Sequence, residues 1–326
     1  MSAFASLPLI TVAGAASKQG RSVASTLLHS GRYRVRALAR SADSAPIREL
    51  AQRGAEIVIA PLEVGRQAEL VAAMRGSHGA FLMTPPIAPV PPPSRPELSL
   101  GIELADAALA AGVEHIVWSS LENVEARTGG NLWAPHFTEK ALVEAYLRTL
   151  PVRSSFIQLA FFYSNFLEHY VPRPETDGSL SFAVYLPPDT PVPFVDPLTA
   201  TGPAVLTQFD EPDSYSGRTL PVIGEVLTAR EIVDTFVRVT GRRAHYASAY
   251  TRDELLRQFP AFGADEWLVR ELVGMVTYAV EYGYYAPERD LTWSRQNDRN
   301  ALTWDGFLRQ SGWRGELTGF GAAMGA

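Results

Sequence analysis

Short apolar runs alternate with longer helix-like segments through the first half of the chain. The apolar runs span residues 9–14, 33–40, 55–60, 79–84, 114–120 and 154–160. The helix-like segments span residues 20–31, 44–54, 67–76, 97–113 and 135–150. Strands that alternate with helices of this length form right-handed βαβ units, so the pattern predicts a parallel sheet with helices on both faces. The runs are apolar without a period of two, which agrees with a sheet covered on both sides.

The alternation stops in the second half of the chain. Residues 161–182 are aromatic and irregular. A strand and a helix follow later, with Thr228 as the N-cap and Glu231 completing a capping box. We therefore expect an α/β fold in which residues 1–160 form a Rossmann-like doubly wound parallel sheet. We expect residues 161–326 to form a smaller C-terminal lobe on the substrate side, with some segments returning to the sheet.

Composition narrows the class of protein. The chain has 326 residues, 46% hydrophobic and 20% charged, which is ordinary for one large globular domain or two closely packed ones. The net charge of -6 argues against a broad basic surface, so we expect no direct sequence-specific nucleic-acid binding. The chain has no cysteine, which excludes disulfides, thiolate nucleophiles and cysteine-based metal sites, and we expect no metal. The N-terminus lacks the basic region of a signal peptide, and no apolar run is long enough to cross a membrane. We expect a cytoplasmic protein without membrane contact.

The sequence GAASKQG, bracketed by Gly14 and Gly20, connects the first predicted strand and helix. Dinucleotide-binding turns in this place usually have three glycines, of which the first permits the tight turn and the last lets the helix pack closely. The middle position here is Ser17, whose hydroxyl is able to bind a phosphate oxygen. Helix-start amides and the helix dipole suit an anion, and Lys18 adds a positive charge. The turn predicts a phosphate site, although such turns also occur without ligands.

Arg40 and Ser41 follow the second predicted strand, where the ribose of an adenine nucleotide lies in this fold. An acidic residue in this place binds the 2′-hydroxyl of NAD, whereas an arginine accommodates the 2′-phosphate of NADP. Arg40 therefore favours NADP(H). The alternative is a solvated arginine in a chain rich in arginine.

The fifth predicted strand ends in Ser119 and Ser120, at the sheet edge where ligands bind. The next helix has His136 and Lys140 four residues apart, so both lie on one face. This resembles the serine, tyrosine and lysine of short-chain dehydrogenases/reductases, with histidine in place of the tyrosine. The alternatives are an ion pair between Lys140 and Glu144, and a histidine of no chemical consequence.

Residues 84–96 form a loop with seven prolines in its last twelve residues. This composition is typical of a stiff polyproline connection, which is the simpler interpretation. The loop also leaves the carboxyl end of the fourth predicted strand, so the alternative is a wall over the ligand cleft.

Together these features resemble the NmrA-like family of atypical short-chain dehydrogenases/reductases, across nearly the whole chain. The segments that carry the resemblance are VAGAASKQGRSVASTLL, RVRALAR, HIVWSSLENV, HFTEKALVEAYLR, FFYSNFLEHYVP and YYAPERDLTWSRQNDRNALTWDGFLRQ. It implies a Rossmann-like core with strand order 3-2-1-4-5-6 and a smaller C-terminal lobe. The family includes NADP(H)-binding transcriptional co-regulators that sense redox state. Related branches reduce quinones, phenylpropanoids and isoflavones, and several of these lack the tyrosine and rely on the lysine.

The resemblance also implies which residues hold NADP(H). The pyrophosphate would be held by Gly14, Ser17, Lys18, Gln19 and Gly20, and the 2′-phosphate by Arg40 with Ser41 beside it. The remaining contacts would come from Thr84 and Pro85 beside the cofactor, Lys140 at the nicotinamide ribose, and Phe161, Phe162 and Asn165 near the nicotinamide. Two departures from the family bear on function. Ser17 stands where the family pattern has a glycine, and its side chain restricts how closely the backbone approaches the cofactor. The missing tyrosine removes the usual proton donor of carbonyl reduction.

Two functions fit this sequence. The first is an NADPH-dependent reductase of a small conjugated or aromatic substrate, which is a quinone, enone, imine or carbonyl compound. Lys140 or His136 would supply the proton, with Ser119 and Ser120 beside them. The second is a non-catalytic NADPH/NADP+ redox sensor that acts as an NmrA-type transcriptional co-regulator. We expect a small-molecule substrate, with either a protein partner or a homodimer.

Overall fold

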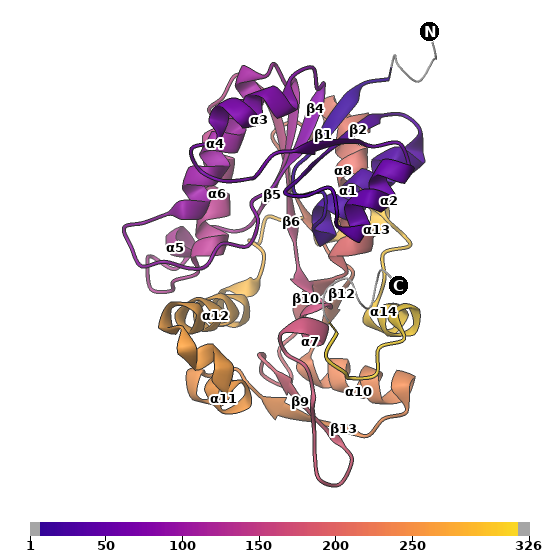
Figure 1. The fold of residues 1–326 in the computed structure, drawn as a ribbon. Coiled ribbons are helices and arrows are strands. Elements are labelled where there is room, and N and C mark those ends of the chain that lie inside the picture. Colours follow the sequence, from indigo (N-terminus) through magenta and orange to yellow (C-terminus); the bar gives the residue numbers. More distant parts are fainter. Residues whose placement is uncertain (1–6, 319–326) are drawn as a thin grey trace.

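Seven strands form one parallel sheet in the computed structural model, which describes residues 7–318 (Figure 1). They are β1 (Leu9–Val12), β2 (Arg34–Ala39), β3 (Glu56–Ile59), β4 (Gly79–Leu82), β5 (His115–Ser120), β6 (Arg153–Leu159) and β11 (Thr219–Val222). Their order across the sheet is β11-β6-β5-β4-β1-β2-β3, and every neighbouring pair is parallel. This confirms the expected order 3-2-1-4-5-6, with β11 added beside β6. Residues 1–6, which belong to the segment tested for a signal peptide, lie outside the described residues.

Helices cover both faces of this sheet, as the alternating pattern predicts (Figure 1). One face is covered by α1 (Lys18–Ser30), α2 (Ala45–Gln52) and α8 (Pro197–Asp210). The other is covered by α3 (Gln67–Met74), α4 (Pro96–Ala110) and α6 (Pro135–Leu147). The strands β1 and β4 are buried at every position. The side chains of β4 enter the hydrophobic cores on both faces, and Ile10 and Val12 of β1 enter the core beneath α1 and α8. The short helices α5 (Val124–Arg127) and α9 (Pro212–Tyr215) follow β5 and α8.

A second lobe lies beyond the carboxyl ends of the strands, in the lower half of Figure 1. Its two sheets have the orders β12-β10-β7 and β13-β9-β8. Their strands are β7 (Phe161–Phe162), β8 (Arg173–Pro174), β9 (Leu180–Val184), β10 (Val192–Val195), β12 (Glu225–Leu227) and β13 (Ala244–Ser248). Its helices are α7 (Asn165–Glu168), α10 (Ala229–Thr240), α11 (Arg252–Gln258), the 3-10 helix η2 (Pro260–Ala264), α12 (Glu266–Tyr278), the π-helix η3 (Ala279–Gly283) and α14 (Trp304–Ser311). The helix α13 (Leu291–Asn297) packs instead against β11.

The capping box predicted at Thr228 is confirmed at the start of α10. The Thr228 hydroxyl oxygen accepts the Glu231 amide at 3.2 Å, and the Glu231 carboxylate accepts the Thr228 amide at 2.8 Å. These bonds satisfy two amides that a helix otherwise leaves without partners. The apolar face of α10, with Ile232 and Phe236 fully buried, packs against α14 and β13.

Two elements from the second half of the chain return to the sheet. The strand β11 pairs with β6, and α8 packs along α1, where the Gly202 amide donates to Ser22 Oγ at 2.9 Å. The chain leaves the sheet after Leu159 and enters the second lobe at Phe161, so the carboxyl edge of the sheet faces that lobe. Within residues 7–318, no helix combines the length and the apolar character needed to span a bilayer.

Candidate active site

The turn between β1 and α1 has the close packing that its two glycines predict. Gly14 has a φ of 62°, which residues with side chains rarely adopt. A Cβ on Gly20 would lie 2.2 Å from the Gly14 carbonyl oxygen, so only glycine permits this approach of the helix to the strand. Ser17 is the N-cap of α1: its Oγ accepts the Gly20 amide at 3.1 Å and donates to Met83 Sδ at 3.4 Å. The Ser17 hydroxyl therefore already has a structural use.

Gln19 links this turn to β5. Its Oε1 accepts the hydroxyl of Ser119 at 2.7 Å, whereas the Ser120 hydroxyl donates to the Leu121 carbonyl at 3.3 Å. Both serines are almost fully buried. The backbone amides of Gln19 and Ala16 have no acceptor among residues 7–318, so the turn offers two N–H donors to an anion.

Lys18 extends from the start of α1 to the second lobe. Its Nζ donates to Ser164 Oγ at 2.6 Å and to Glu168 Oε2 at 2.7 Å, and the Lys18 and Glu168 side chains are only 14% and 15% exposed. Burial lowers the pKa of Lys18, although the hydrogen bond and charge of Glu168 and the charge of Asp196 oppose that lowering. The ammonium thus joins the turn to α7, and a pyrophosphate in the turn would compete with Glu168 for it.

Arg40 and Ser41 lie exposed at the end of β2. Within residues 7–318 the structure gives the Arg40 guanidinium no hydrogen bond or ion pair. Ser41 Oγ accepts the Asp43 amide at 3.1 Å and donates to the Asp43 carboxylate at 3.4 Å. The nearest acid in sequence is therefore bonded to Ser41, and Arg40 is accessible to a phosphate.

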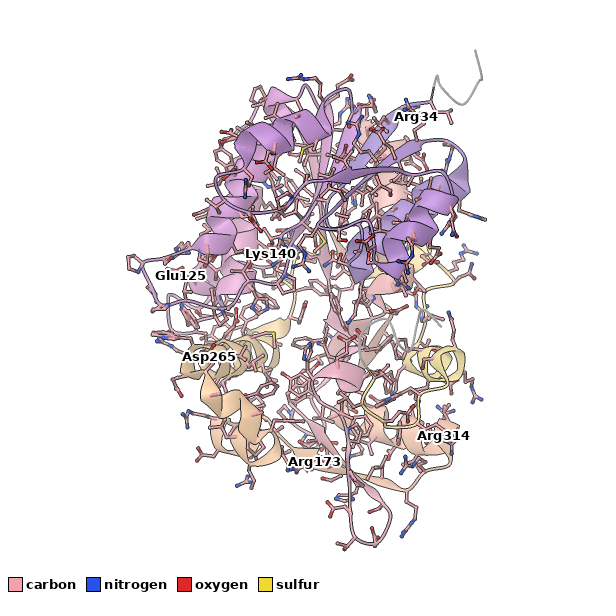
Figure 2. The ribbon with its side chains drawn as sticks, viewed as in Figure 1. Arg34, Glu125, Lys140, Arg173, Asp265 and Arg314 are labelled. Carbon is pink, nitrogen blue, oxygen red and sulfur yellow. The ribbon has the colours of Figure 1, made fainter. Side chains whose placement is uncertain are left out.

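Lys140 pairs with Glu97, a residue that the sequence does not single out. The Lys140 ammonium and the Thr84 hydroxyl donate to the same carboxylate oxygen, Glu97 Oε1. The side chains of Lys140 and Glu97 are 14% and 6% exposed, and Figure 2 shows Lys140 inside the molecule, near the junction with the second lobe. Glu97 lies in the first turn of α4, where an acid ordinarily stabilises the helix dipole. An acid in this position is common, so the sequence alone does not indicate that Glu97 contacts Lys140.

His136 pairs with Glu271 of α12. Glu271 Oε1 lies 2.5 Å from His136 Nδ1 and also accepts the His136 amide at 3.1 Å. The side chains are 30% and 8% exposed. Burial by itself raises the pKa of Glu271, but the His136 ring, the hydrogen bonds from His136 and the Lys140 charge together hold that pKa below its ordinary value. A buried carboxylate thus stands beside two basic groups. Glu271 was missed because it lies far along the chain, in a helix that the sequence pattern did not predict.

The residues expected near the nicotinamide differ in exposure. Phe161 is buried, with its ring centre 4.8 Å from that of Tyr284. Phe162, Asn165 and Pro85 are half-buried. Phe161 therefore belongs to the aromatic core, and the other three keep surface that a ligand is able to contact.

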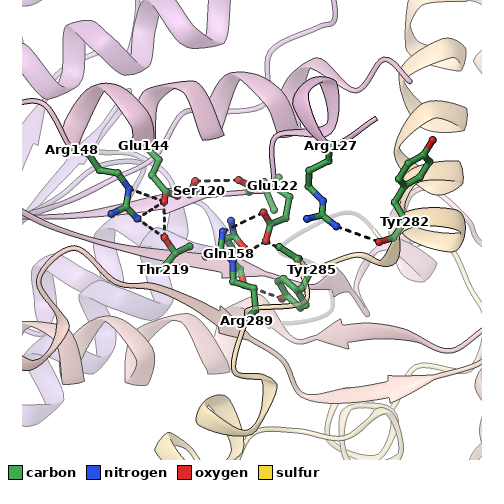
Figure 3. Close-up of polar contacts among 12 residues, drawn as sticks. Ser120, Glu122, Arg127, Glu144, Arg148, Gln158, Thr219, Tyr282, Tyr285 and Arg289 are labelled. Carbon is green, nitrogen blue, oxygen red and sulfur yellow. Dashed lines mark hydrogen bonds and ion pairs between the residues drawn. The ribbon is translucent and has the colours of Figure 1, made fainter. Parts of the chain in front are cut away.

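The alternative pairing of Lys140 with Glu144 is wrong. Glu144 lies one turn further along α6, and its Oε1 accepts Arg148 at 2.7 Å and the Thr219 hydroxyl at 2.6 Å (Figure 3). Glu144 thus connects α6 to β11. The partner of Lys140 is therefore Glu97 and not Glu144.

A neighbouring polar cluster ties the segment after η3 to the carboxyl edge of the sheet (Figure 3). Glu122 Oε1 accepts the Arg289 guanidinium at 2.8 Å and the Ala286 amide at 3.0 Å. The Tyr285 hydroxyl donates to the Gln158 carbonyl at 2.9 Å. The Gln158 side-chain amide is buried and makes no hydrogen bond with the described part of the chain.

The expected site residues therefore lie in several separate clusters, of which Lys18 with Glu168 and His136 with Glu271 are two. Gln19 joins the Gly14–Gly20 turn to Ser119, Glu97 joins Thr84 to Lys140, and Arg40 stands apart at the end of β2. In residues 7–318, no group of three or more histidine and acidic side chains is arranged to hold a metal ion.

Comparison with known proteins places these features in a family. The model of the NmrA-like family matches residues 8–308. The NmrA-like family domain-containing oxidoreductase FrzB of Cladobotryum sp is 32% identical over 296 residues, which are 86% of this chain and 87% of that protein.

Solved structures agree on the fold. NmrA, a negative transcriptional regulator crystallised with NADP, aligns with a TM-score of 0.74 at 22% identity, covering 93% of this chain and 95% of that one. The triphenylmethane reductase of Citrobacter sp., crystallised with NADP(H), aligns with a TM-score of 0.71 at 15% identity, covering 93% and 99%. At these identities the two structures establish a shared fold.

Proposed function

This chain belongs to the NmrA-like family, and from that premise we propose that it is an NADPH-dependent reductase of a small conjugated or aromatic substrate. The substrate class is a quinone, enone, imine or carbonyl compound. The observation that carries the proposal is the pair of acid–base contacts on one face of α6: Lys140 with Glu97, and His136 with Glu271. These contacts support a reductase because a carboxylate beside a basic group can orient a proton donor, and both basic groups lie on the helix face where this superfamily pattern places them.

The residues of the turn fit a dinucleotide. The turn allows close approach because Gly14 and Gly20 have no side chain, and it presents the amides of Ala16 and Gln19. We assign the pyrophosphate to Gly14, Ser17, Lys18, Gln19 and Gly20. Ser17 would contribute through the backbone, because its hydroxyl caps α1.

The remaining cofactor contacts follow the same edge of the sheet. Arg40, with Ser41 beside it, would bind the 2′-phosphate, and Lys140 would bind the nicotinamide ribose. The buried Thr84 and the half-buried Pro85 would flank the cofactor. The half-buried Phe162 and Asn165 would lie near the nicotinamide, with Phe161 supporting them from the core.

When bound, NADPH supplies a hydride. The side chains of this protein would bind the substrate beside it, exclude water and supply a proton. Lys140 and His136 are the two groups able to give that proton, and each is held by a carboxylate. We assign Ser119 a supporting part, because its hydroxyl holds Gln19, and Ser120 a similar part at the buried strand end.

One observation favours the second candidate, a non-catalytic NADPH/NADP+ sensor. Lys18 connects the Gly14–Gly20 turn to α7, so cofactor occupancy has a direct route to the second lobe. NmrA itself is a negative transcriptional regulator crystallised with NADP. In this role the chain would act through a protein partner, because its net charge of -6 does not suit direct DNA binding.

The deciding experiment is NADPH oxidation by the purified protein with a panel of quinones, enones and imines. A reductase oxidises NADPH with at least one of them, and Lys140→Met slows that turnover. Tight NADPH binding with no oxidation across the panel would favour the sensor.

A further inference from the structure

We propose that Glu271 is a positioning residue for His136, and that this pair, built from both lobes, makes His136 Nε2 the proton donor of the reduction. This inference rests on the proposed reductase function. It goes beyond it by choosing between His136 and Lys140, and by assigning a role to a residue of α12.

The hydrogen bond between His136 and Glu271 fixes which ring nitrogen carries a hydrogen. Glu271 Oε1 lies 2.5 Å from His136 Nδ1, and the same oxygen accepts the His136 backbone amide at 3.1 Å. An ionised carboxylate only accepts, so Nδ1 carries a hydrogen. The other nitrogen, Nε2, has no hydrogen-bond partner among residues 7–318, and the ring keeps 30% of its surface exposed. The carboxylate holds one side of the ring, and the other side remains open.

The position of Glu271 is fixed by close packing of α12 against the segment before α6. A Cβ on Gly274 would lie 2.2 Å from the Trp133 carbonyl oxygen, so the two segments touch at a point that only glycine permits. The Trp133 and Trp267 rings lie 5.4 Å apart at 61°, and the Arg270 guanidinium lies over both. Gly274 is three residues beyond Glu271, so this contact brings the carboxylate to the first turn of α6.

The neighbouring carboxylates give Lys140 and His136 different roles. Glu97 and Thr84 hold Lys140 on the side of α4, with its ammonium bonded to a buried carboxylate oxygen. Lys140 also contributes to holding the pKa of Glu271 low, so Glu271 stays ionised and keeps the hydrogen on Nδ1. Lys140 is thus committed to a fixed contact, and His136 presents an open nitrogen.

In the proposed reduction, NADPH would supply the hydride and His136 the proton. The substrate double bond receives the hydride at carbon, and its π electrons move to the heteroatom. That atom takes the proton from Nε2 of the imidazolium. His136 is left neutral with hydrogen on Nδ1, and Glu271 stays ionised throughout. Solvent at the exposed ring edge returns the proton to Nε2.

Proton NMR of the protein without cofactor tests the positioning. A short hydrogen bond to a carboxylate gives a strongly deshielded Nδ1 proton, which His136→Asn must remove if it is assigned correctly. We expect Glu271→Gln to remove it too, because glutamine has no negative charge, although its carbonyl still accepts the His136 amide. The matched control is Glu281→Gln, an exposed glutamate just beyond α12, which should leave the signal unchanged. A deshielded proton that survives Glu271→Gln would overturn the inference.

Steady-state kinetics tests the chemistry on a substrate that the parent reduces. We expect Glu271→Gln and His136→Asn each to lower kcat roughly 100-fold, with KM for NADPH nearly unchanged. The double variant should lose little more than either single variant, because the two residues act as one unit. Losses that multiply in the double variant would refute the pairing. If the parent reduces nothing on the panel, the reductase proposal fails, and the NMR signal still upholds or overturns the positioning.

Discussion

The Lys18 ammonium lies 2.7 Å from the Glu168 carboxylate, so the Gly14–Gly20 turn is joined directly to α7 of the second lobe. The positive charge that Lys18 would present to a phosphate is already held by the Glu168 carboxylate. Under the proposed assignment of Lys18 to the pyrophosphate, cofactor binding shares or breaks a contact between two parts of the fold. Ser164 is the second acceptor of Lys18, and it precedes the expected nicotinamide contact Asn165.

Replacing Glu168 should strengthen cofactor binding. In Glu168→Gln the neutral amide competes less well for Lys18, and more of the positive charge reaches the pyrophosphate. A difference of about 1 kcal/mol corresponds to roughly fivefold tighter NADPH binding, measured by calorimetry. Lys18→Met should weaken binding instead. The control is Glu175→Gln, an exposed glutamate of the second lobe. Unchanged affinity in Glu168→Gln would mean that Lys18 does not serve the cofactor.

Arg40 should set the preference for NADPH over NADH. It lies exposed at the end of β2, and a phosphate there gains charge-assisted hydrogen bonds of about 1.5–3 kcal/mol. Arg40→Ala should therefore lose roughly tenfold or more in NADPH affinity and keep its NADH affinity. Equal affinities for the two cofactors in the parent protein would contradict this assignment.

The sequence predicts the sheet well because its signals are local. Each strand of the first half is a short apolar run, and the turn glycines and the Thr228 capping box depend on neighbouring residues alone. The site is harder to predict because its partners are distant. Glu97 looks like an ordinary acid at a helix start, and Glu168 and Glu271 meet Lys18 and His136 only after the chain has folded back. Nothing near Lys140 in sequence distinguishes Glu97 from Glu144 as its partner.

Lys140 should be irreplaceable for turnover. We expect Lys140→Met to lower the rate roughly 100-fold, with a smaller change in NADPH affinity, because its charge helps to keep Glu271 ionised and Glu271 holds the proton donor His136. Lys140→Arg should be nearly as damaging, because a wide planar guanidinium does not fit the contact with Glu97 and the ribose as an ammonium does. Full turnover in Lys140→Met would exclude Lys140 from the reaction.

The same variant should also lose stability for a separate reason. Lys140→Met leaves the Glu97 carboxylate, 6% exposed, with only the Thr84 hydroxyl. Breaking such a buried pair costs about 3 kcal/mol in the free energy of unfolding. Adding Glu97→Gln should restore most of this stability in urea titrations and none of the turnover. Stability that stays low in the double variant would mean that the unpaired carboxylate is not the cause.

The stability contributed by Glu271 should depend on pH in one direction. Its pKa in the folded protein is held below the ordinary value of 4.5 by His136 and Lys140, so ionised Glu271 stabilises the fold. We expect the difference in unfolding free energy between the parent and Glu271→Gln to be fully present at about pH 5. It should shrink as the pH falls through the lowered pKa. A difference that grows on acidification would contradict an ionised Glu271.

The place of β11 determines when the sheet is complete during synthesis. The strand β6 ends at Leu159, but its outer neighbour begins only at Thr219, and α8, which covers α1, lies between them in sequence. A growing chain therefore carries β6 with the backbone N–H and C=O groups of its outer edge unpaired until residue 222 has left the ribosome, which is a hazard for association with other strands. A fragment cut after residue 160 would keep that edge open permanently and would also uncover the face of α1 that α8 packs against. The boundary predicted after residue 160 is for this reason a poor place to divide the chain for expression.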